Sequence, residues 1–199
     1  MIRHITTLPH IIFFKRSPQK DIIEKDIKRW VQVYDPKRAN NPAVENLDWL
    51  IKEYKEFRNI FYYRIGGCVT FLGKLLFQLS KVLYAPMDTL YIRTPSIGPG
   101  LFIQHGFATT IGAHKIGENC WINQQVTIGK KSQGNCPTIG DNVRISCGAK
   151  VLGKLTIGDN SIVGANAVVV KDVPPDCTVV GVPAYIIKRD GQRVNEPLE

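Results

Sequence analysis

The sequence lacks any long apolar run. No stretch approaches the roughly 20 consecutive apolar residues that a helix needs to cross a bilayer. The apolar part of the N-terminus, MIRHITTLPHIIFFKRS, is shorter than a signal peptide requires, and Pro9 interrupts it. We therefore expect neither a secretory leader nor a membrane-spanning helix.

Cysteine is scarce, and its spacing fits no paired site. The five cysteines are Cys68, Cys120, Cys136, Cys147 and Cys177. An odd number without a CxxC pair argues against both a disulfide framework and a zinc site. The sequence therefore predicts a protein without a metal, in a reducing cytoplasm.

Motifs for nucleotides and nucleic acids are also missing. The segments GAHKIGENC and GKKSQGNC match neither a phosphate loop nor a dinucleotide fingerprint. No aromatic–basic RNA motif or DNA-reading module occurs, so we expect no nucleic acid partner. The net charge of +9 favours some other anionic ligand, although the scattered basic residues also fit an ordinary solvated surface.

A six-residue period runs through residues 97–173. Branched aliphatic residues recur every six positions from 116 to 128 and, after one break, from 139 to 169, often followed by glycine. This period fits neither an α-helix nor a flat strand, but it is the signature of a parallel β-helix with three short strands per coil. Over about residues 91–173, the predicted interior side chains are Ile122, Ile128, Ile145, Val151, Ile157 and Val163.

Residues 1–88 show helical periodicity instead. Three amphipathic helices are predicted, one after Ser17-Pro18, one from Asn41-Pro42 to about residue 66, and one over 72–83. The apolar face of the third helix is expected to pack on the other helices or on a neighbouring subunit, with a membrane surface as the alternative. The predicted organisation is a helical region, 1–88, and a β-helix domain with a C-terminal tail over its last coil, 89–199.

Four histidines are candidates for proton transfer. His4 and His10 lie in the N-terminal arm, where surface positions are expected. His105 lies at the first break of the repeat, where a neutral imidazole can take a proton from a hydroxyl. The alternative is a corner histidine bonded to backbone, and His114 in the same irregular stretch is the competitor. The polar loop GKKSQGNCPT forms the second break, and we interpret its Cys136 as an ordinary thiol.

Residues 91–189 resemble the hexapeptide-repeat acyltransferases and, among them, the serine acetyltransferase group. The matching motifs are IGPGLFIQHG, VTIGKK, PTIGDNVRISCGAKVLGKLTIGDNSIVGANAVVVKDVPP and VVGVPAYII, with DIKRWVQVYDP and FYYRIG in the helical part. The resemblance implies a left-handed parallel β-helix, a homotrimer, and acetyl-CoA bound between neighbouring prisms. It also implies direct acetyl transfer to an acceptor hydroxyl, with His105 as the catalytic base.

Departures from the group concern the acceptor. Leu90 stands where the group has the Asp that orients the base, and Asp88 lies two residues earlier. Gln104 replaces an Asp that helps to hold the amine of serine, and Cys136 replaces a His thought to hold its carboxylate. Asp35 is the one matching acceptor carboxylate. Because a buried unpaired charge is costly, these losses argue against free serine.

The motifs FIQHGFA, VTIGK and NCPTIG resemble a second group of hexapeptide-repeat acyltransferases more closely. This group is the colanic-acid and capsular-polysaccharide O-acetyltransferases. A neutral sugar hydroxyl needs hydrogen-bond partners such as Gln104 and Asn135 rather than ion pairs. The prediction is therefore an acetyl-CoA-dependent O-acetyltransferase of a surface polysaccharide or its precursor, with peripheral membrane contact through a lipid-linked acceptor. The alternatives are a serine O-acetyltransferase of cysteine biosynthesis and a non-catalytic β-helix scaffold.

The predicted site has a coenzyme part and an acceptor part. Cations are expected to bind the coenzyme phosphates, namely Lys130, Lys131, Lys150, Lys171, Lys188 and Arg189. Gly129, Cys147 and Ala165 complete the acetyl-CoA set, and a backbone N–H near Gly129 is expected to stabilise the oxyanion. The acceptor set consists of Asp35, Gln104, Asn135 and Cys136.

Overall fold

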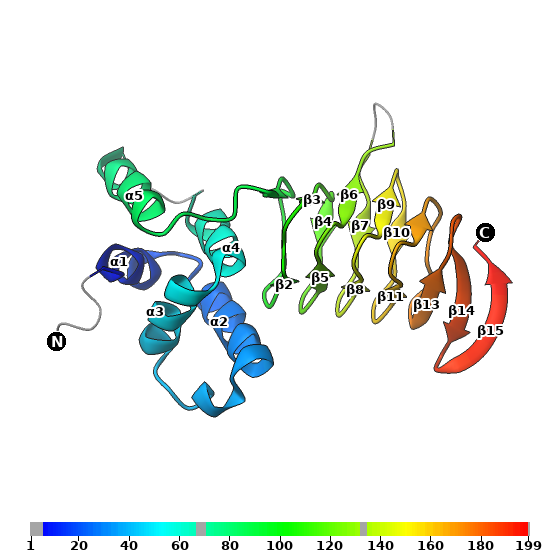
Figure 1. The fold of residues 1–199 in the computed structure, drawn as a ribbon, viewed down its shortest axis with the longest axis horizontal. Coiled ribbons are helices and arrows are strands. Elements are labelled where there is room, and N and C mark those ends of the chain that lie inside the picture. Colours follow the sequence, from blue (N-terminus) through cyan, green and yellow to red (C-terminus); the bar gives the residue numbers. More distant parts are fainter. Residues whose placement is uncertain (1–5, 67–70, 132–134, 199) are drawn as a thin grey trace. The chain divides into compact units, whose positions relative to one another are not determined.

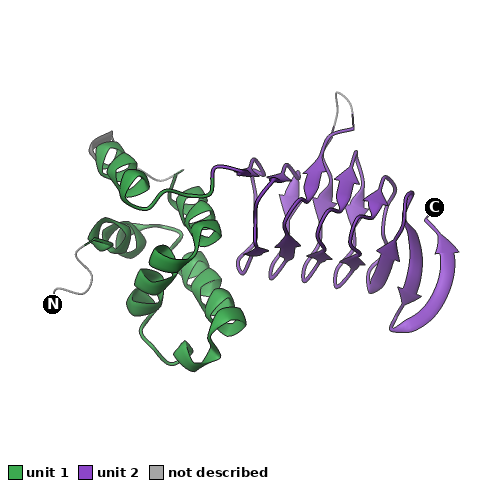
Figure 2. Ribbon diagram, in the orientation of Figure 1, with its two compact units in different colours: residues 1–87 green, residues 88–199 purple. Residues whose placement is uncertain are grey.

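The computed structural model describes residues 6–66, 71–131 and 135–198. It divides into two compact units, residues 1–87 and 88–199 (Figure 2). That these units are separate domains with a boundary after residue 88 stays a prediction. His4, Cys68 and residues 132–134 of the second break lie outside the described residues. Within the described part of the chain, no helix is long and apolar enough to cross a membrane.

The first unit is helical, as predicted. Its elements are α1 (Leu8–Arg16), α2 (Lys20–Tyr34), the 3₁₀ helix η2 (Pro36–Arg38), α3 (Ala43–Glu53), α4 (Lys55–Gly66) and α5 (Phe71–Leu83). The single helix predicted from residue 41 to 66 is wrong, because it divides at Tyr54. The backbone of Tyr54 is extended, with φ −118° and ψ 109°. The two pieces still share one core, in which Leu50, Phe57 and Trp30 are fully buried.

The surface position predicted for His10 is also wrong. His10 is fully buried on α1, and its Nε2 lies 2.8 Å from the hydroxyl of Tyr62. Burial, with a smaller contribution from the Arg58 guanidinium, lowers the pKa of His10 to about 4, so the ring is neutral at pH 7. The surface position was expected because His10 lies in the N-terminal arm, but this arm forms α1, whose first turn accommodates Pro9.

The second unit is a parallel β-helix built from three sheets (Figure 1). Sheet A contains β1 (Leu90–Ile92), β3 (Thr109–Ile111), β6 (Thr127–Gly129), β9 (Lys150–Leu152) and β12 (Val168–Val169). Sheet B contains β4 (Lys115–Ile116), β7 (Thr138–Ile139) and β10 (Thr156–Ile157). Sheet C contains β2 (Phe102–Gln104), β5 (Trp121–Asn123), β8 (Arg144–Ile145), β11 (Ile162–Val163), β13 (Cys177–Val180), β14 (Tyr185–Arg189) and β15 (Gln192–Pro197).

The six-residue period sets the register between coils. In sheet A, Val151 is paired with Ile128 of the preceding coil and with Val169 of the following one. All six side chains predicted to fill the interior are 0% exposed. These positions confirm the predicted hexapeptide β-helix, in which each coil covers the apolar residues of its neighbours.

The sequence Gly-Asp-Asn occurs at residues 140–142 and 158–160, in the corner that joins sheet B to sheet C. A Cβ on Gly98 would lie 2.6 Å from the backbone of Gly117 in the next coil, so glycine permits the close stacking of coils. Asn142 and Asn160 adopt left-handed backbone with φ of 56° and 59°, a region that asparagine tolerates better than most residues. Their side chains continue the stack, because Asn142 Nδ2 donates to Asn160 Oδ1 at 3.1 Å.

The C-terminal tail extends sheet C beyond the last coil. Strand β14 pairs antiparallel with β13, and β15 pairs antiparallel with β14. The side of β13 that faces away from the coils is therefore hydrogen-bonded rather than left as an open edge, which removes a site for unwanted strand pairing.

Candidate functional site

The candidate residues of the β-helix gather mainly at two of its corners. What we call the first corner joins sheet C to sheet A and contains residues 105–108, 124–126, 146–149 and 164–167. The second corner joins sheet A to sheet B and contains residues 112–114, 130–131, 135–137, 153–155 and 170–172. A strand of three residues spans about 10 Å, and this length separates the two corners of one coil.

His105 occupies the first corner, directly after β2, and is exposed. Its φ of 61° lies in the left-handed region, which histidine visits more often than most residues but at a cost of about 1–3 kcal/mol. The N–H of Phe107 donates to the carbonyl of His105 and closes a tight turn. Strained backbone that a rigid scaffold maintains is common at functional sites.

The first corner is wider around His105 than in the next coil. Five residues, 105–109, separate the paired positions Gln104 and Thr110, whereas three residues separate the partners of these positions, Asn123 and Thr127. The two additional residues account for the irregular spacing at the first break of the repeat. The predicted acceptor residue Gln104 precedes this bulge, and its Oε1 accepts a hydrogen bond from Asn123 Nδ2 at 2.9 Å.

Two positions bear on the carboxylate expected to orient the base, Leu90 and Asp88. Leu90 is only 4% exposed and is paired with Thr109, so it belongs to the core. Asp88 is exposed.

Two predicted acetyl-CoA residues share the first corner with His105. Cys147 and Ala165 stand at the same place in successive coils, and the N–H of Asn166 donates to the carbonyl of Cys147 at 2.9 Å. Ala165 is exposed and Cys147 is half-buried. The structure thus brings the predicted base and these small side chains to one edge of the prism, where a long ligand could lie across several coils.

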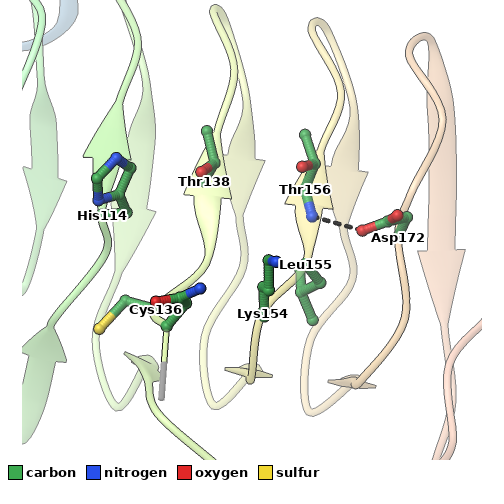
Figure 3. A pocket seen from close by; sticks show the side chains of 8 residues that line it. His114, Cys136, Thr138, Lys154, Leu155, Thr156 and Asp172 are labelled. Atoms are coloured by element: carbon green, nitrogen blue, oxygen red, sulfur yellow. Dashed lines mark hydrogen bonds between the residues drawn. The ribbon is translucent and has the colours of Figure 1, made fainter.

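The second corner carries a pocket of about 390 Å³ (Figure 3). Its lining residues are His114, Asn135, Cys136, Thr138, Lys154, Leu155, Thr156 and Asp172. A volume in this range suits a small organic ligand. The predicted acceptor residues Asn135 and Cys136 therefore lie with His114, the competitor of His105, and not with His105 itself.

Charged groups of both signs line this pocket and were missed by the sequence reasoning. The ammonium group belongs to Lys154 and the carboxylate to Asp172, whose Oδ1 accepts the N–H of Thr156 at 2.6 Å (Figure 3). The usable signal was the register. Cys136 lies three residues before Ile139 and Lys154 lies three before Ile157, and these two isoleucines are paired. The interrupted repeat between 128 and 139 concealed this relation.

Gly129 ends β6 at the second corner, next to Lys130 and Lys131. A Cβ on Gly129 would meet no atom within 4 Å, so a ligand can approach the backbone closely there. Lys130 and Lys131 are exposed, and a Cβ on Gly153 would lie 3.7 Å from that of Lys131. The open backbone and the adjacent cations fit the predicted role in holding a phosphorylated co-substrate.

The other cations predicted to bind the coenzyme lie at separate places in the β-helix unit. Lys150 Nζ donates to the carbonyl of Gln125 at 2.6 Å, and Lys171 Nζ donates to that of Leu198 at 3.0 Å. On β14, Lys188 is exposed and Arg189 forms an ion pair of 2.6 Å with Glu196. The structure therefore does not gather all six cations at one place.

Asp35 belongs to the helical unit. It follows α2, and its Oδ2 lies 3.3 Å from Arg38 Nε. In the described part of the chain, no group of three or more His, Cys, Asp or Glu side chains is placed to hold a metal ion.

Comparisons with known proteins agree with this architecture. The family model of bacterial transferase hexapeptide proteins, with six repeats, matches residues 136–171. The serine acetyltransferase of Synechococcus elongatus is 49% identical over 168 residues, which are 80% of this chain and 67% of that protein. The serine acetyltransferase of Staphylococcus xylosus is 48% identical over 107 residues, so the match spans 52% of this chain and half of that relative.

A solved structure is similar as well. A serine acetyltransferase in complex with CoA has a TM-score of 0.62 and 30% sequence identity, with 88% of this chain and 72% of that one covered. Taken with the two relatives, it extends the likeness from the repeats to most of the chain, helical region included.

Proposed function

We propose that this protein transfers an acetyl group from acetyl-CoA to an acceptor hydroxyl. The premise is that the chain belongs to the serine acetyltransferase family of hexapeptide-repeat transferases. The observation that carries the proposal is the exposed His105 on left-handed backbone at the widened first corner. An exposed imidazole at this corner can meet a hydroxyl brought to the surface of the prism. The relative solved with CoA supports acetyl-CoA as the donor.

The proposed chemistry is a direct transfer. His105 removes the proton of the acceptor hydroxyl as its oxygen attacks the thioester carbonyl, so that a C–O bond forms. The tetrahedral intermediate collapses with loss of the C–S bond, and the thiolate takes the proton back from the imidazolium. A positioned base of this kind contributes about 10²–10⁴-fold. Gly129, whose surroundings are open, is the proposed donor to the oxyanion.

The site is proposed to be shared between copies of the chain. His105, Cys147 and Ala165 lie at the first corner, whereas Gly129, Asn135 and Cys136 lie at the second, with a strand of sheet A between them. In the proposed threefold arrangement, the first corner of one copy lies against the second corner of the next, which is a head-to-tail contact that closes into a ring of three. The base and the acceptor residues can then meet across an interface, as the predicted homotrimer requires.

We therefore expect a homotrimer, or a multiple of three, in solution. Light scattering coupled to size exclusion at micromolar concentration, with and without CoA, gives the mass directly. A mass of three or six chains agrees with the shared site, because pockets between prisms need neighbours. A monomer under both conditions would contradict it.

L-serine is the proposed acceptor. Both relatives are named serine acetyltransferase. Gln104 and Cys136 replace an Asp and a His expected to hold the charged groups of serine, but the pocket at the second corner offers two other charged side chains. Lys154 can pair with the carboxylate of serine and Asp172 with its ammonium, so neither charge need be buried alone. Asn135 and Cys136 line the same pocket and can hydrogen-bond the remainder of the ligand.

A sugar hydroxyl is the second candidate. The observation in its favour is the neutral amide pair of Gln104 and Asn123, which lies one residue from His105 and suits an uncharged hydroxyl. The closer likeness to colanic-acid and capsular-polysaccharide O-acetyltransferases, together with a lipid-linked acceptor, stays a prediction.

The acceptor test compares thiol release from acetyl-CoA with L-serine and with a panel of oligosaccharides at equal concentration. We expect kcat/KM for L-serine of about 10⁴ M⁻¹s⁻¹ or above, the ordinary range for an enzyme with its own substrate. Ethanolamine and 3-hydroxypropionate, which each lack one charge of serine, are the matched controls. Both should react at least tenfold more slowly, because each leaves a charged group of the site without a partner.

The other outcomes also decide between candidates. Efficient transfer to an oligosaccharide with background rates on serine would contradict the serine assignment and support the second candidate. If none of the acceptors gave any release of thiol above background, the non-catalytic scaffold would be the better explanation of the fold.

A further inference from the structure

Helix α5 turns an apolar face away from the rest of the helical unit. Leu75 is 81% exposed and Val82 is 79% exposed, while Leu79 and Leu83 are each about half exposed. The opposite side of the helix is buried, since Phe77 packs edge-on against Phe13 and Ser80 is fully inaccessible. We name Leu75, Leu79, Val82 and Leu83 the α5 face. Packing of these four side chains on the other helices, one of the two expected partners, is therefore not observed among the described residues, and packing on a neighbouring subunit stays a prediction.

The contacts of α5 show how it lies against α1. Thr6 Oγ1 is 2.7 Å from the hydroxyl of Tyr84, and the rings of Phe13 and Phe77 are 5.8 Å apart. A residue just before α1 is therefore next to the residue after α5, and a residue near the end of α1 is next to the middle of α5. The two helices run antiparallel. This pairing brings the last turn of α1, which carries Lys15 and Arg16, towards the half of α5 that carries Lys74.

The charge around the α5 face has one sign. Neither α1 nor α5 contains an acidic residue, and Lys15, Arg16 and Lys74 are all exposed. The acidic residue that contacts the start of α1, Asp48, is buried and forms an ion pair of 2.8 Å with Lys52. A helix that combines an exposed aliphatic stripe with an exposed lysine and contains no acidic residue fits the pattern of a helix that lies in the interface of an anionic membrane.

The same charges disfavour a two-fold contact between the α5 faces of two copies. In a two-fold contact between α5 faces, each basic residue would approach its own equivalent, because such an interface is self-complementary. Like charges brought together without an acidic partner weaken the contact. A surface rich in phosphate groups has the opposite effect, and the net charge of +9 adds to it.

We propose that the α5 face docks the protein peripherally on an anionic phospholipid surface, with its four aliphatic side chains in the headgroup region and the nearby cations against lipid phosphates. This docking is independent of which acceptor the acetyl group reaches. It keeps the chain at the membrane without a spanning helix.

The test is sedimentation of the full-length chain with vesicles. The probes are vesicles of phosphatidylcholine alone and of phosphatidylcholine with one third phosphatidylglycerol. We expect at least tenfold stronger partitioning onto the anionic vesicles. The double substitution Leu75→Gln with Val82→Gln should reduce that partitioning at least tenfold, and Lys74→Gln should reduce it less and mainly at low salt.

Val182→Gln is the matched control, because it removes an aliphatic side chain that is 72% exposed and lies outside α5. It should bind vesicles as the unaltered chain does. Thiol release from acetyl-CoA reports that each variant is folded, since none of these residues belongs to the proposed site. Equal recovery of the unaltered chain with both vesicle types, or full binding by the Leu75 and Val82 double variant, would overturn the proposal. So would a lower oligomeric mass of the double variant without any vesicle binding, because the α5 face would then be a contact between copies.

Discussion

Val151→Asp is expected to abolish folding of the β-helix. Val151 is 0% exposed and lies between Ile128 and Val169 in the stack of sheet A. A buried carboxylate without a partner costs several kcal/mol, and the lost valine contact adds about 1.5–3 kcal/mol. Native proteins are stable by only about 5–15 kcal/mol, and a break in one coil uncovers the coils on either side.

Circular dichroism and thermal unfolding of the purified chain measure this effect. The control is Val182→Asp, the same chemical change at a position that is 72% exposed, which should alter stability only slightly. A soluble Val151→Asp protein with a cooperative transition near that of the unaltered chain would contradict the interior position of Val151 and with it the assigned register.

The β-helix was predictable because its signal repeats. Each coil places one branched side chain inside at the same point, so a single spacing of six fixes fold, register and interior together. The helical unit offers no such repetition. The amphipathic stripe from Leu47 to Phe61 continues across Tyr54, and nothing in that stripe marks the extended backbone that separates α3 from α4.

The candidate site was predictable in its parts but not in its arrangement. The irregular spacing before Ile111 marks the bulge that exposes His105, since an interrupted repeat must release residues from the ladder. The grouping of Cys136 with Lys154 and Asp172 was missed because the loop between Ile128 and Ile139 interrupts the repeat, although Ile139, Ile157 and Val173 still lie in register. The partner of the α5 face was left open for a related reason, because hydrophobic periodicity does not say whether a helix packs on its own unit, on a neighbouring subunit or on a membrane.

His105→Ala is expected to lower kcat for acetyl transfer at least about a hundredfold, with little change in affinity for CoA. The imidazole acts on the acceptor proton, so its loss removes general base catalysis and leaves the binding of the donor intact. Steady-state kinetics with varied acceptor, together with calorimetric titration of CoA, separate these two quantities. His114 lies at the other corner of the prism, in the pocket with Asn135 and Cys136, and His114→Ala should have a milder effect on kcat.

A second substitution distinguishes lost chemistry from lost geometry. Alanine is strained at φ 61°, so His105→Ala could reduce activity by moving the turn as well as by removing the ring. Asparagine adopts left-handed backbone readily but cannot serve as a base at neutral pH. His105→Asn should therefore match His105→Ala in kcat while melting at the temperature of the unaltered chain. If the Asn variant retained most of its activity, His105 would be a residue that shapes the corner, and the base would have to be sought at His114.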